Sequence, residues 1–150
     1  MQPSEVRDRV LRDHAGLREL IERVESLARE VSGGERPQVR ELRTAAETLL
    51  STLLRHMDWE DRELVPALAD SDAWGPERAR RLSEEHVEQR QFLGGVIEGL
   101  RDSQRPPMAL AASLIDLAQT LLIDMEEEEA FFLDPDVLRD DVIGINVETG

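Results

Sequence analysis

The chain has 150 residues, with 33 Asp and Glu against 18 Lys and Arg, a formal net charge of −15, and no cysteine or tyrosine. A chain of this length is expected to form one domain with a core of its own. The missing cysteines exclude a disulfide framework, a cysteine-ligated zinc site, an iron–sulfur cluster and a thiol nucleophile. The strong negative charge disfavours binding to nucleic acid and to anionic membranes.

The rest of the composition favours a soluble bundle of helices. Hydrophobic residues make up 40% of the chain and aromatic residues only 3%, so Leu, Val, Ile and Ala must build the core. Such a core is typical of helical bundles rather than of β-sandwiches. The N-terminal segment is charged throughout, and no apolar run approaches the roughly 20 residues that a membrane span needs. We therefore expect a soluble, cytoplasmic protein that has no membrane partner.

Four amphipathic segments follow one another along the chain, and turn-forming residues separate them. Ser4 is the predicted N-cap of the first helix, and Ser32-Gly33-Gly34 is its predicted end. Pro76 suits the first turn of the third helix, and Pro106-Pro107 suits the start of the fourth. The predicted helices cover about residues 4–31, 38–68, 76–102 and 107–134.

Short connections between four long helices predict an all-α fold, an antiparallel up-down-up-down four-helix bundle. We assign residues 1–133 to this bundle. Residues 134–150 form a short C-terminal tail that contains Val142, Ile143 and Ile145. These residues are too apolar for a free tail, so we expect it to pack on the bundle or on a partner chain, a homodimer being one arrangement that fits.

The three histidines of the chain, His14, His56 and His86, interrupt the apolar stripes of three different helices. The fourth helix carries Asp124 and Glu128 in the same kind of position. At about 1.5 Å rise per residue, these positions lie roughly 13–18 Å from the helix ends, so antiparallel packing brings them to one level. Polar groups are costly to bury without partners, and a bound metal would satisfy them.

Two of these positions begin a pair with i,i+4 spacing. His56 is followed one turn later by Glu60, and Asp124 by Glu128. This spacing places both side chains of a pair on the same face of the helix. The two-fold arrangement suits two metal ions side by side.

An internal salt-bridge cluster is the main alternative to a metal. Arg90 lies one turn after His86, and its guanidinium would reach Asp124 or Glu128 in a bundle. An arginine in that place would satisfy buried carboxylates without a metal.

The acidic run around Glu128 does not determine the rotation of the fourth helix about its own axis. Glu128 continues the apolar stripe of the fourth helix, so it is predicted to point inward. Glu126 and Glu129 are predicted to face solvent. Glu127 and Glu129 are the fallback ligands if the helix is rotated slightly.

In this order and spacing, the motifs resemble those of hemerythrin-like domains, also described as HHE cation-binding domains. The resemblance covers about residues 4–133. It rests on Arg12-Asp13-His14, the segment 53–61 (LLRHMDWED), Glu85-His86, and Glu127-Glu128 before Phe131-Phe132.

The resemblance implies a non-heme centre of two iron ions, bridged by oxide and carboxylate, inside the bundle. His14 and His56 would bind one iron and His86 the other, while Glu60 and Glu128 would bridge the two.

Two positions depart from the family pattern. Arg90 stands where the family usually has a second histidine one turn after His86, and Asp124 stands where it usually has the histidine that opens the last motif. Asp124 is then a substitute oxygen ligand for the second iron. If this substitution weakens the second iron site, only the first is expected to be fully occupied. A shell so rich in carboxylate favours ferric iron and leaves room for water or peroxide.

The function expected from this resemblance is binding of, or reaction with, O2, peroxide or nitric oxide, and catalase-like removal of peroxide is the favoured reaction. The alternatives are a non-catalytic iron or oxygen sensor, an iron-binding protein, and a degenerate bundle without metal. The physiological oxidant and electron donor stay open at this point.

Overall fold

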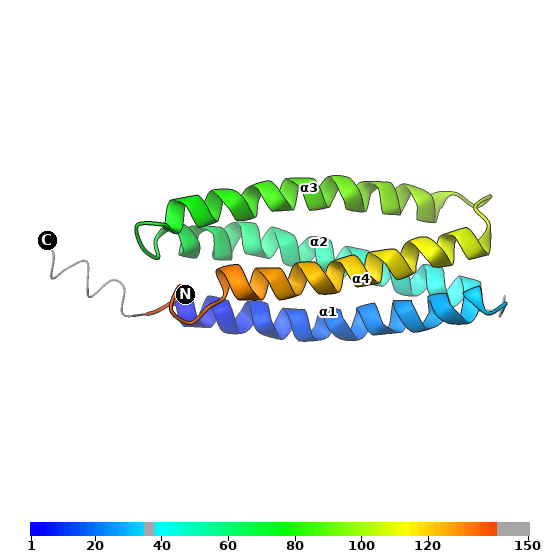
Figure 1. Cartoon of the computed structure of the whole chain (residues 1–150), viewed down its shortest axis with the longest axis horizontal. Helices are drawn as coiled ribbons and strands as arrows, with labels where there is room; N and C mark the ends of the chain where they lie inside the picture. The colour runs from blue at the N-terminus through cyan, green and yellow to red at the C-terminus, as the bar shows by residue number, and fades with distance from the viewer. Residues whose placement is uncertain (35–37, 141–150) are drawn as a thin grey trace, which may run out of the picture.

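Four long helices form an antiparallel bundle in the structure, a computed structural model that describes residues 1–34 and 38–140 (Figure 1). Successive helices run in opposite directions, so the predicted all-α, up-down-up-down four-helix bundle is confirmed. The helices are α1 (Pro3–Ser32), α2 (Val39–Ala69), α3 (Gly75–Arg101) and α4 (Pro107–Phe132).

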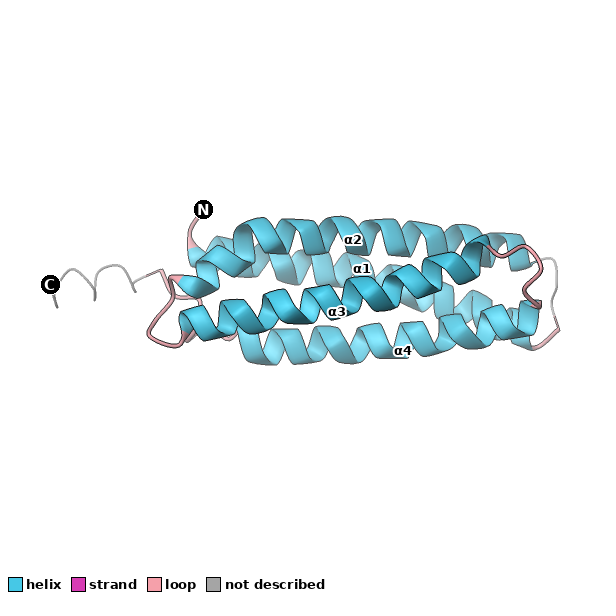
Figure 2. Ribbon diagram, turned by 90° about the horizontal axis from the view of Figure 1, so that it is seen from above, coloured by secondary structure: helices cyan, strands magenta, loops and turns pink. Residues whose placement is uncertain are grey.

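The helices do not pack equally closely. α1 packs along both α2 and α4, and α2 packs along α3. α3 and α4 lie next to each other, but they contact each other much less than these three pairs do (Figure 2). The bundle is therefore least tightly closed between α3 and α4.

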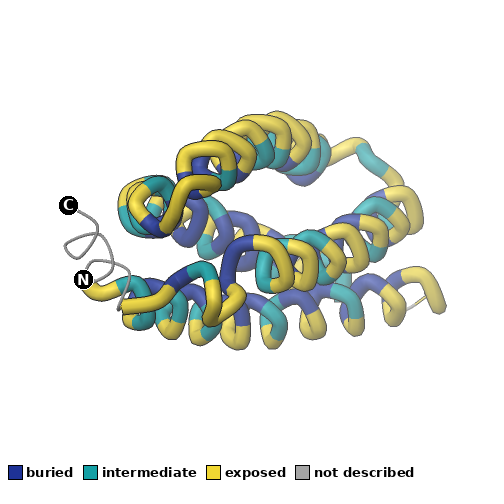
Figure 3. The backbone as a smooth tube through the Cα atoms, turned by 60° about the vertical axis from the view of Figure 1, so that its left-hand side comes forward, coloured by how far each residue is buried: buried dark blue, intermediate teal, exposed yellow. Residues whose placement is uncertain are grey.

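The apolar core is divided into two clusters along the length of the bundle. Buried residues lie on the sides of the helices that face one another, and exposed residues lie on the outside (Figure 3). One cluster includes Leu17, Leu49, Leu93 and Leu114, and the other joins the opposite ends of the helices around Phe132. The histidines and acidic residues singled out by the sequence lie between these two clusters.

The start of α1 differs from the prediction. Gln2 is the N-cap residue, and its side chain forms a reciprocal capping box with Glu5. Ser4 lies inside the helix, where its backbone N and its Oγ donate hydrogen bonds to the carboxylate of Asp140, at 2.9 and 2.6 Å. The side chain that looked like a cap therefore joins Asp140 of the tail to α1.

The tail is described only as far as Asp140. Leu138 is buried among the residues around Phe132, and Arg7 donates a hydrogen bond of 2.6 Å to the carbonyl oxygen of Leu133. This part of the tail packs on the bundle. The apolar residues at 142, 143 and 145, on which the expected packing of the tail was based, lie outside the described residues.

The hydropathy of α4 departs from the expectation that no apolar run is long enough to span a membrane. Among the described residues, α4 is the one helix that is long and apolar enough to do so, with a mean hydropathy of 1.5. Most of its charges gather near its C-terminal end, and Asp116 is the one charged residue in the stretch before Asp124. A core helix of a bundle passes the same test, so a single helix of this kind is a weak indication of a membrane span.

Candidate metal centre

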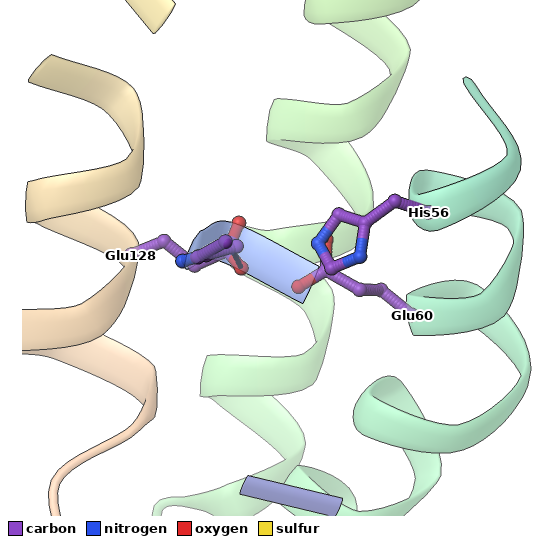
Figure 4. Close-up of side chains that lie close together, drawn as sticks. His56, Glu60 and Glu128 are labelled. Atoms are coloured by element: carbon purple, nitrogen blue, oxygen red, sulfur yellow. Dashed lines mark ion pairs between the residues drawn. The ribbon is translucent and has the colours of Figure 1, made fainter. Parts of the chain in front are cut away.

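Four side chains from three helices converge between the two apolar clusters. His14 comes from α1, His56 and Glu60 from α2, and Glu128 from α4. Each offers one potential ligand atom, and these atoms all lie within 4.8 Å of one another. Figure 4 shows His56 and Glu60 facing Glu128 across the interior. The spacing of the four atoms is small enough for one metal ion to bind them together.

His86 of α3 joins this group through Glu60. The Nε2 atoms of His86 and of His56 each lie 3.3 Å from the same oxygen, Oε1 of Glu60. On the other side, Nε2 of His14 lies 3.2 Å from Oε1 of Glu128. All three imidazoles thus turn Nε2 toward the carboxylates, and the two carboxylates lie between imidazoles from different helices.

The opposite ring nitrogen of each histidine meets a further carboxylate. Nδ1 of His14 lies 2.9 Å from Glu129, and Nδ1 of His56 lies 3.1 Å from Asp13. Nδ1 of His86 lies 2.6 Å from Asp61. With Nδ1–H donating to these oxygens, Nε2 is left unprotonated and available to bind a metal.

An arginine in turn contacts each of these outer carboxylates. Arg9 lies 3.2 Å from Asp13, Arg90 lies 2.6 Å from Asp61, and Arg18 contacts Glu129. The three histidines are therefore each oriented by an arginine–carboxylate pair, which fixes the ring and its tautomer.

The outer carboxylates were not identified as a group from the sequence, although a signal for them was present. Each is the chain neighbour of one inner residue and contacts a different one. Asp13 precedes His14 but contacts His56, and Glu129 follows Glu128 but contacts His14. A helical residue lies about 100° around the axis from its neighbour, so it points at the adjacent helix instead of the bundle centre.

Three acidic positions of α4 can be compared with their predictions. Glu129 was predicted to face solvent, but its side chain is 27% exposed and contacts His14 and Arg18. Glu126 is exposed, as predicted. Asp124 lines the cavity beside the centre and accepts a 3.4 Å hydrogen bond from Gln89, but it does not belong to the group of converging ligand atoms.

Arg90 does not form the salt-bridge cluster considered from the sequence. Its guanidinium lies 2.9 Å from Asp58 and 2.6 Å from Asp61, both on α2. Among the described residues, its ion pairs do not include Asp124 or Glu128, so this arginine does not neutralise the inner carboxylates.

The interior leaves several polar atoms without hydrogen-bond partners among the described residues. They are Nε2 of His56, Oε2 of Glu60, Nε2 of His86 and Oε1 of Glu128. An unpaired buried polar atom costs about 1–3 kcal/mol. Because all four belong to residue types that ligate metals and all are in or beside the converging group, the donor set fits a bound cation.

The two inner carboxylates oppose each other electrostatically. Burial and the nearby Glu60 raise the pKa of Glu128 well above its ordinary value. Burial also tends to raise the pKa of Glu60, but interactions with Glu128, His56 and His86 outweigh this and lower it. The pair therefore tends to hold a proton between its two carboxylates, and a metal ion would replace that proton.

The same burial and the same carboxylates shift the pKa values of the three histidines. Burial lowers the pKa of His56 and of His86, but Glu60 and the outer carboxylates outweigh it, so both pKa values are raised. Burial dominates at His14, whose pKa is lowered despite its contact with Glu129.

A small cavity of about 30 Å³ adjoins the centre. It is enough for one or two molecules of the size of water. Apolar side chains form most of its wall, among them Leu53, Phe92 and Met125. Only a small ligand would fit beside the converging side chains.

Fold and site together define the class of a metal-binding four-helix bundle with a layer of histidine and carboxylate ligands. The family model described as hemerythrin HHE cation binding domain matches residues 6–133. The chain therefore belongs to this family, which makes it a metal-binding domain. Comparisons with curated proteins and with solved structures gave no match.

Proposed function

We propose that this chain is a non-heme iron protein that binds two iron ions and removes peroxide in a catalase-like reaction. The observation that carries the proposal is the convergence of three histidine nitrogens and two carboxylates on a buried point, with several of their atoms unpartnered. Nitrogen and carboxylate donors together are typical of non-heme iron sites.

The residues divide into two groups. His14 and His56 would hold one iron and His86 the other, with Glu60 and Glu128 between them. When bound, iron supplies the Lewis acidity and the redox change that cleavage of an O–O bond requires.

The protein's contribution is positioning and exclusion. Asp13, Asp61 and Glu129 orient the three imidazoles through Nδ1, so that each Nε2 faces inward before a ligand arrives. The apolar cavity excludes large molecules and admits those of the size of peroxide, O2 or nitric oxide.

Peroxide is favoured over reversible O2 binding because of the number and type of the donors. Among the described residues, five side chains converge, fewer than two six-coordinate ions require, so positions would stay open for a small molecule. Arg90 is directed to α2 and supplies no ligand, which leaves His86 as the one nitrogen donor on its side in the described part of the chain. On the His86 side, Glu60 and Glu128 would provide more donors than nitrogen does, and carboxylate oxygen stabilises ferric iron, which disfavours a reversible O2 carrier.

The test is iron content together with peroxide turnover. Purified protein should contain about two irons per chain by elemental analysis, and an oxygen electrode should detect O2 release on addition of H2O2. Glu60→Ala should abolish both, whereas Glu126→Ala, which changes an exposed residue of α4, should alter neither. Iron-loaded protein that releases no O2 would contradict the reaction, and protein without metal affinity would contradict the centre.

A further inference from the structure

An acidic groove runs between α3 and α4, where the bundle is least tightly closed. Its volume is about 370 Å³. Five carboxylates line it, and none of the described residues in its wall is an arginine. These five are Glu85, Glu88, Asp124, Glu127 and Glu128.

Most of these carboxylates have no arginine partner among residues 1–34 and 38–140. Arg81 approaches Glu85 at 3.6 Å. Within the described part of the chain, no arginine pairs with Glu88, Asp124 or Glu127. The groove is therefore a concentrated negative region that attracts cations and repels anions.

The groove leads to the metal centre. Gln89, Phe92, Asp124 and Glu128 line both the groove and the small cavity beside the converging ligands. The same cavity reaches His14, His56 and Glu60. Solvent and centre are thus connected through one wall of the bundle, past Asp124.

Unpartnered polar atoms mark the inner end of this connection. Glu60 is 1% exposed, and its Oε2 makes no hydrogen bond among the described residues. Oε1 of Glu128 is likewise buried and unpartnered, and Glu128 belongs to the groove wall itself. A cation that moves along the groove would therefore reach carboxylate oxygen atoms that have no other partner among the described residues.

The opposite face of the bundle has the opposite charge. A groove between α1 and α2 also reaches His56, but three arginines, Arg9, Arg12 and Arg55, line it against one carboxylate, Asp13. A divalent cation would be repelled there. The charge distribution therefore selects the α3–α4 side.

We infer that the α3–α4 groove is the uptake route for the divalent cation, with Asp124 and Glu127 as carboxylates that hold the ion transiently before Glu128 receives it. The inference rests on the proposed metal centre and gives Asp124 a role outside the ligand shell. It also predicts that these carboxylates change the rates of metal binding and release but not the affinity at equilibrium. The reason is that a metal ion enters and leaves the centre by the same route.

The test is the rate of Co2+ binding to metal-free protein, followed by visible absorption in a stopped-flow instrument at low ionic strength. Asp124→Asn combined with Glu127→Gln should slow binding about tenfold, the lower end of what electrostatic guidance provides. Co2+ release to a chelator should slow by a similar factor, so the affinity at equilibrium should stay within about twofold.

The matched control removes the same charge elsewhere. Glu19→Gln combined with Glu126→Gln changes two exposed carboxylates outside the groove, and it should bind Co2+ at the wild-type rate. Equal rates for the two double variants would overturn the route. Loss of one Co2+ at equilibrium from the Asp124→Asn, Glu127→Gln variant would also overturn it, because Asp124 would then be a ligand. Wild-type protein that binds no Co2+ would instead overturn the proposed centre.

Discussion

At the scale of single residues, the histidines are held by partners that flank the ligands in the sequence. Each Nδ1 meets a carboxylate, and each of those carboxylates meets an arginine. Because the ring can rotate about two bonds, a histidine without such a partner would present Nε2 in several directions. The outer carboxylates thus fix the orientation of the imidazole rings before a metal binds, so metal binding does not have to restrict their rotation.

Glu129 provides the clearest test of this positioning role. Glu129→Ala removes the acceptor of His14 Nδ1 and leaves His14 itself in place. We expect iron affinity to fall by about 10–100-fold, the usual effect of losing such a partner. Competition with a chelator would measure it. Glu129→Gln, whose amide oxygen still accepts a hydrogen bond, should recover part of the affinity. Glu126→Ala is the control, and equal affinities for the two alanine variants would show that Glu129 has no positioning role.

Glu128 should have opposite effects on the metal-bound and metal-free protein. Its pKa is raised by burial and by Glu60, so its charge opposes folding when no metal is present. Glu128→Gln should therefore stabilise the metal-free protein, because the neutral amide places no charge beside Glu60 in the buried layer. The same change should lower the iron content. Denaturant unfolding in the presence of a chelator measures the first effect, and a less stable metal-free variant would contradict it.

At the scale of the helices, the sequence predicts much of the site because the apolar stripes have a clear phase. The stripes place His14, His56 and Glu128 on inward faces, and the structure brings these three together. The same reasoning includes Asp124, which shares the inward side of α4 but lines the cavity instead of joining the converging group. Periodicity identifies a face, but it does not determine how far along that face the ligand atoms meet.

What the stripes do not predict is contact between neighbouring helices. Glu129 lies off the stripe of α4, and only the position of α1 beside α4 brings it to His14. Arg90 lies on α3, and the closer packing of α3 against α2 than against α4 directs it to Asp61. Such contacts depend on how closely two helices pack, and the apolar stripe of one helix does not predict this distance.

Glycines at two places in α3 should respond oppositely to substitution. Gly95 lies within the helix, and a Cβ there would meet nothing within 4 Å. Gly95→Ala should raise the free energy of unfolding by about 0.5–1 kcal/mol, because alanine is the better helix former. Gly75 lies at the turn after α2, where a Cβ would come within 2.2 Å of the carbonyl oxygen of Leu68. Gly75→Ala should destabilise by about 1–3 kcal/mol.

Urea unfolding of both variants measures this pair of effects. If Gly95→Ala were destabilising, the helix at that position would have to pack against something the described residues do not include. If Gly75→Ala were neutral, the turn between α2 and α3 would have to shift without cost.

At the scale of the whole molecule, a polar layer divides the core of a strongly acidic bundle. Leu17 on one side and Phe132 on the other belong to separate apolar clusters, and the layer between them is where the two inner carboxylates meet. In metal-free protein, bound protons and the neighbouring histidines compensate these charges in place of a metal ion. Its stability should therefore depend on protons that a metal ion would displace.

The last prediction is that metal-free protein loses stability as the pH rises, whereas the metal-loaded protein does not. Folding raises the pKa of Glu128, His56 and His86, from ordinary values of 4.5 for the carboxyl and 6.5 for the imidazoles. A group with a raised pKa stabilises the folded state below its unfolded pKa, and this contribution is lost as the pH rises through the folded value. The lowered pKa of Glu60 affects stability only below its ordinary value of 4.5, and in the window above it the lowered pKa of His14 opposes the three raised values. Between about pH 5 and about pH 8, the melting temperature in the presence of a chelator should fall, and the gap to the iron-saturated protein should widen. Melting curves recorded across this range provide the measurement. A metal-free melting temperature that stays constant or rises toward pH 8 would mean that the buried carboxylates and imidazoles do not hold protons in place of a metal.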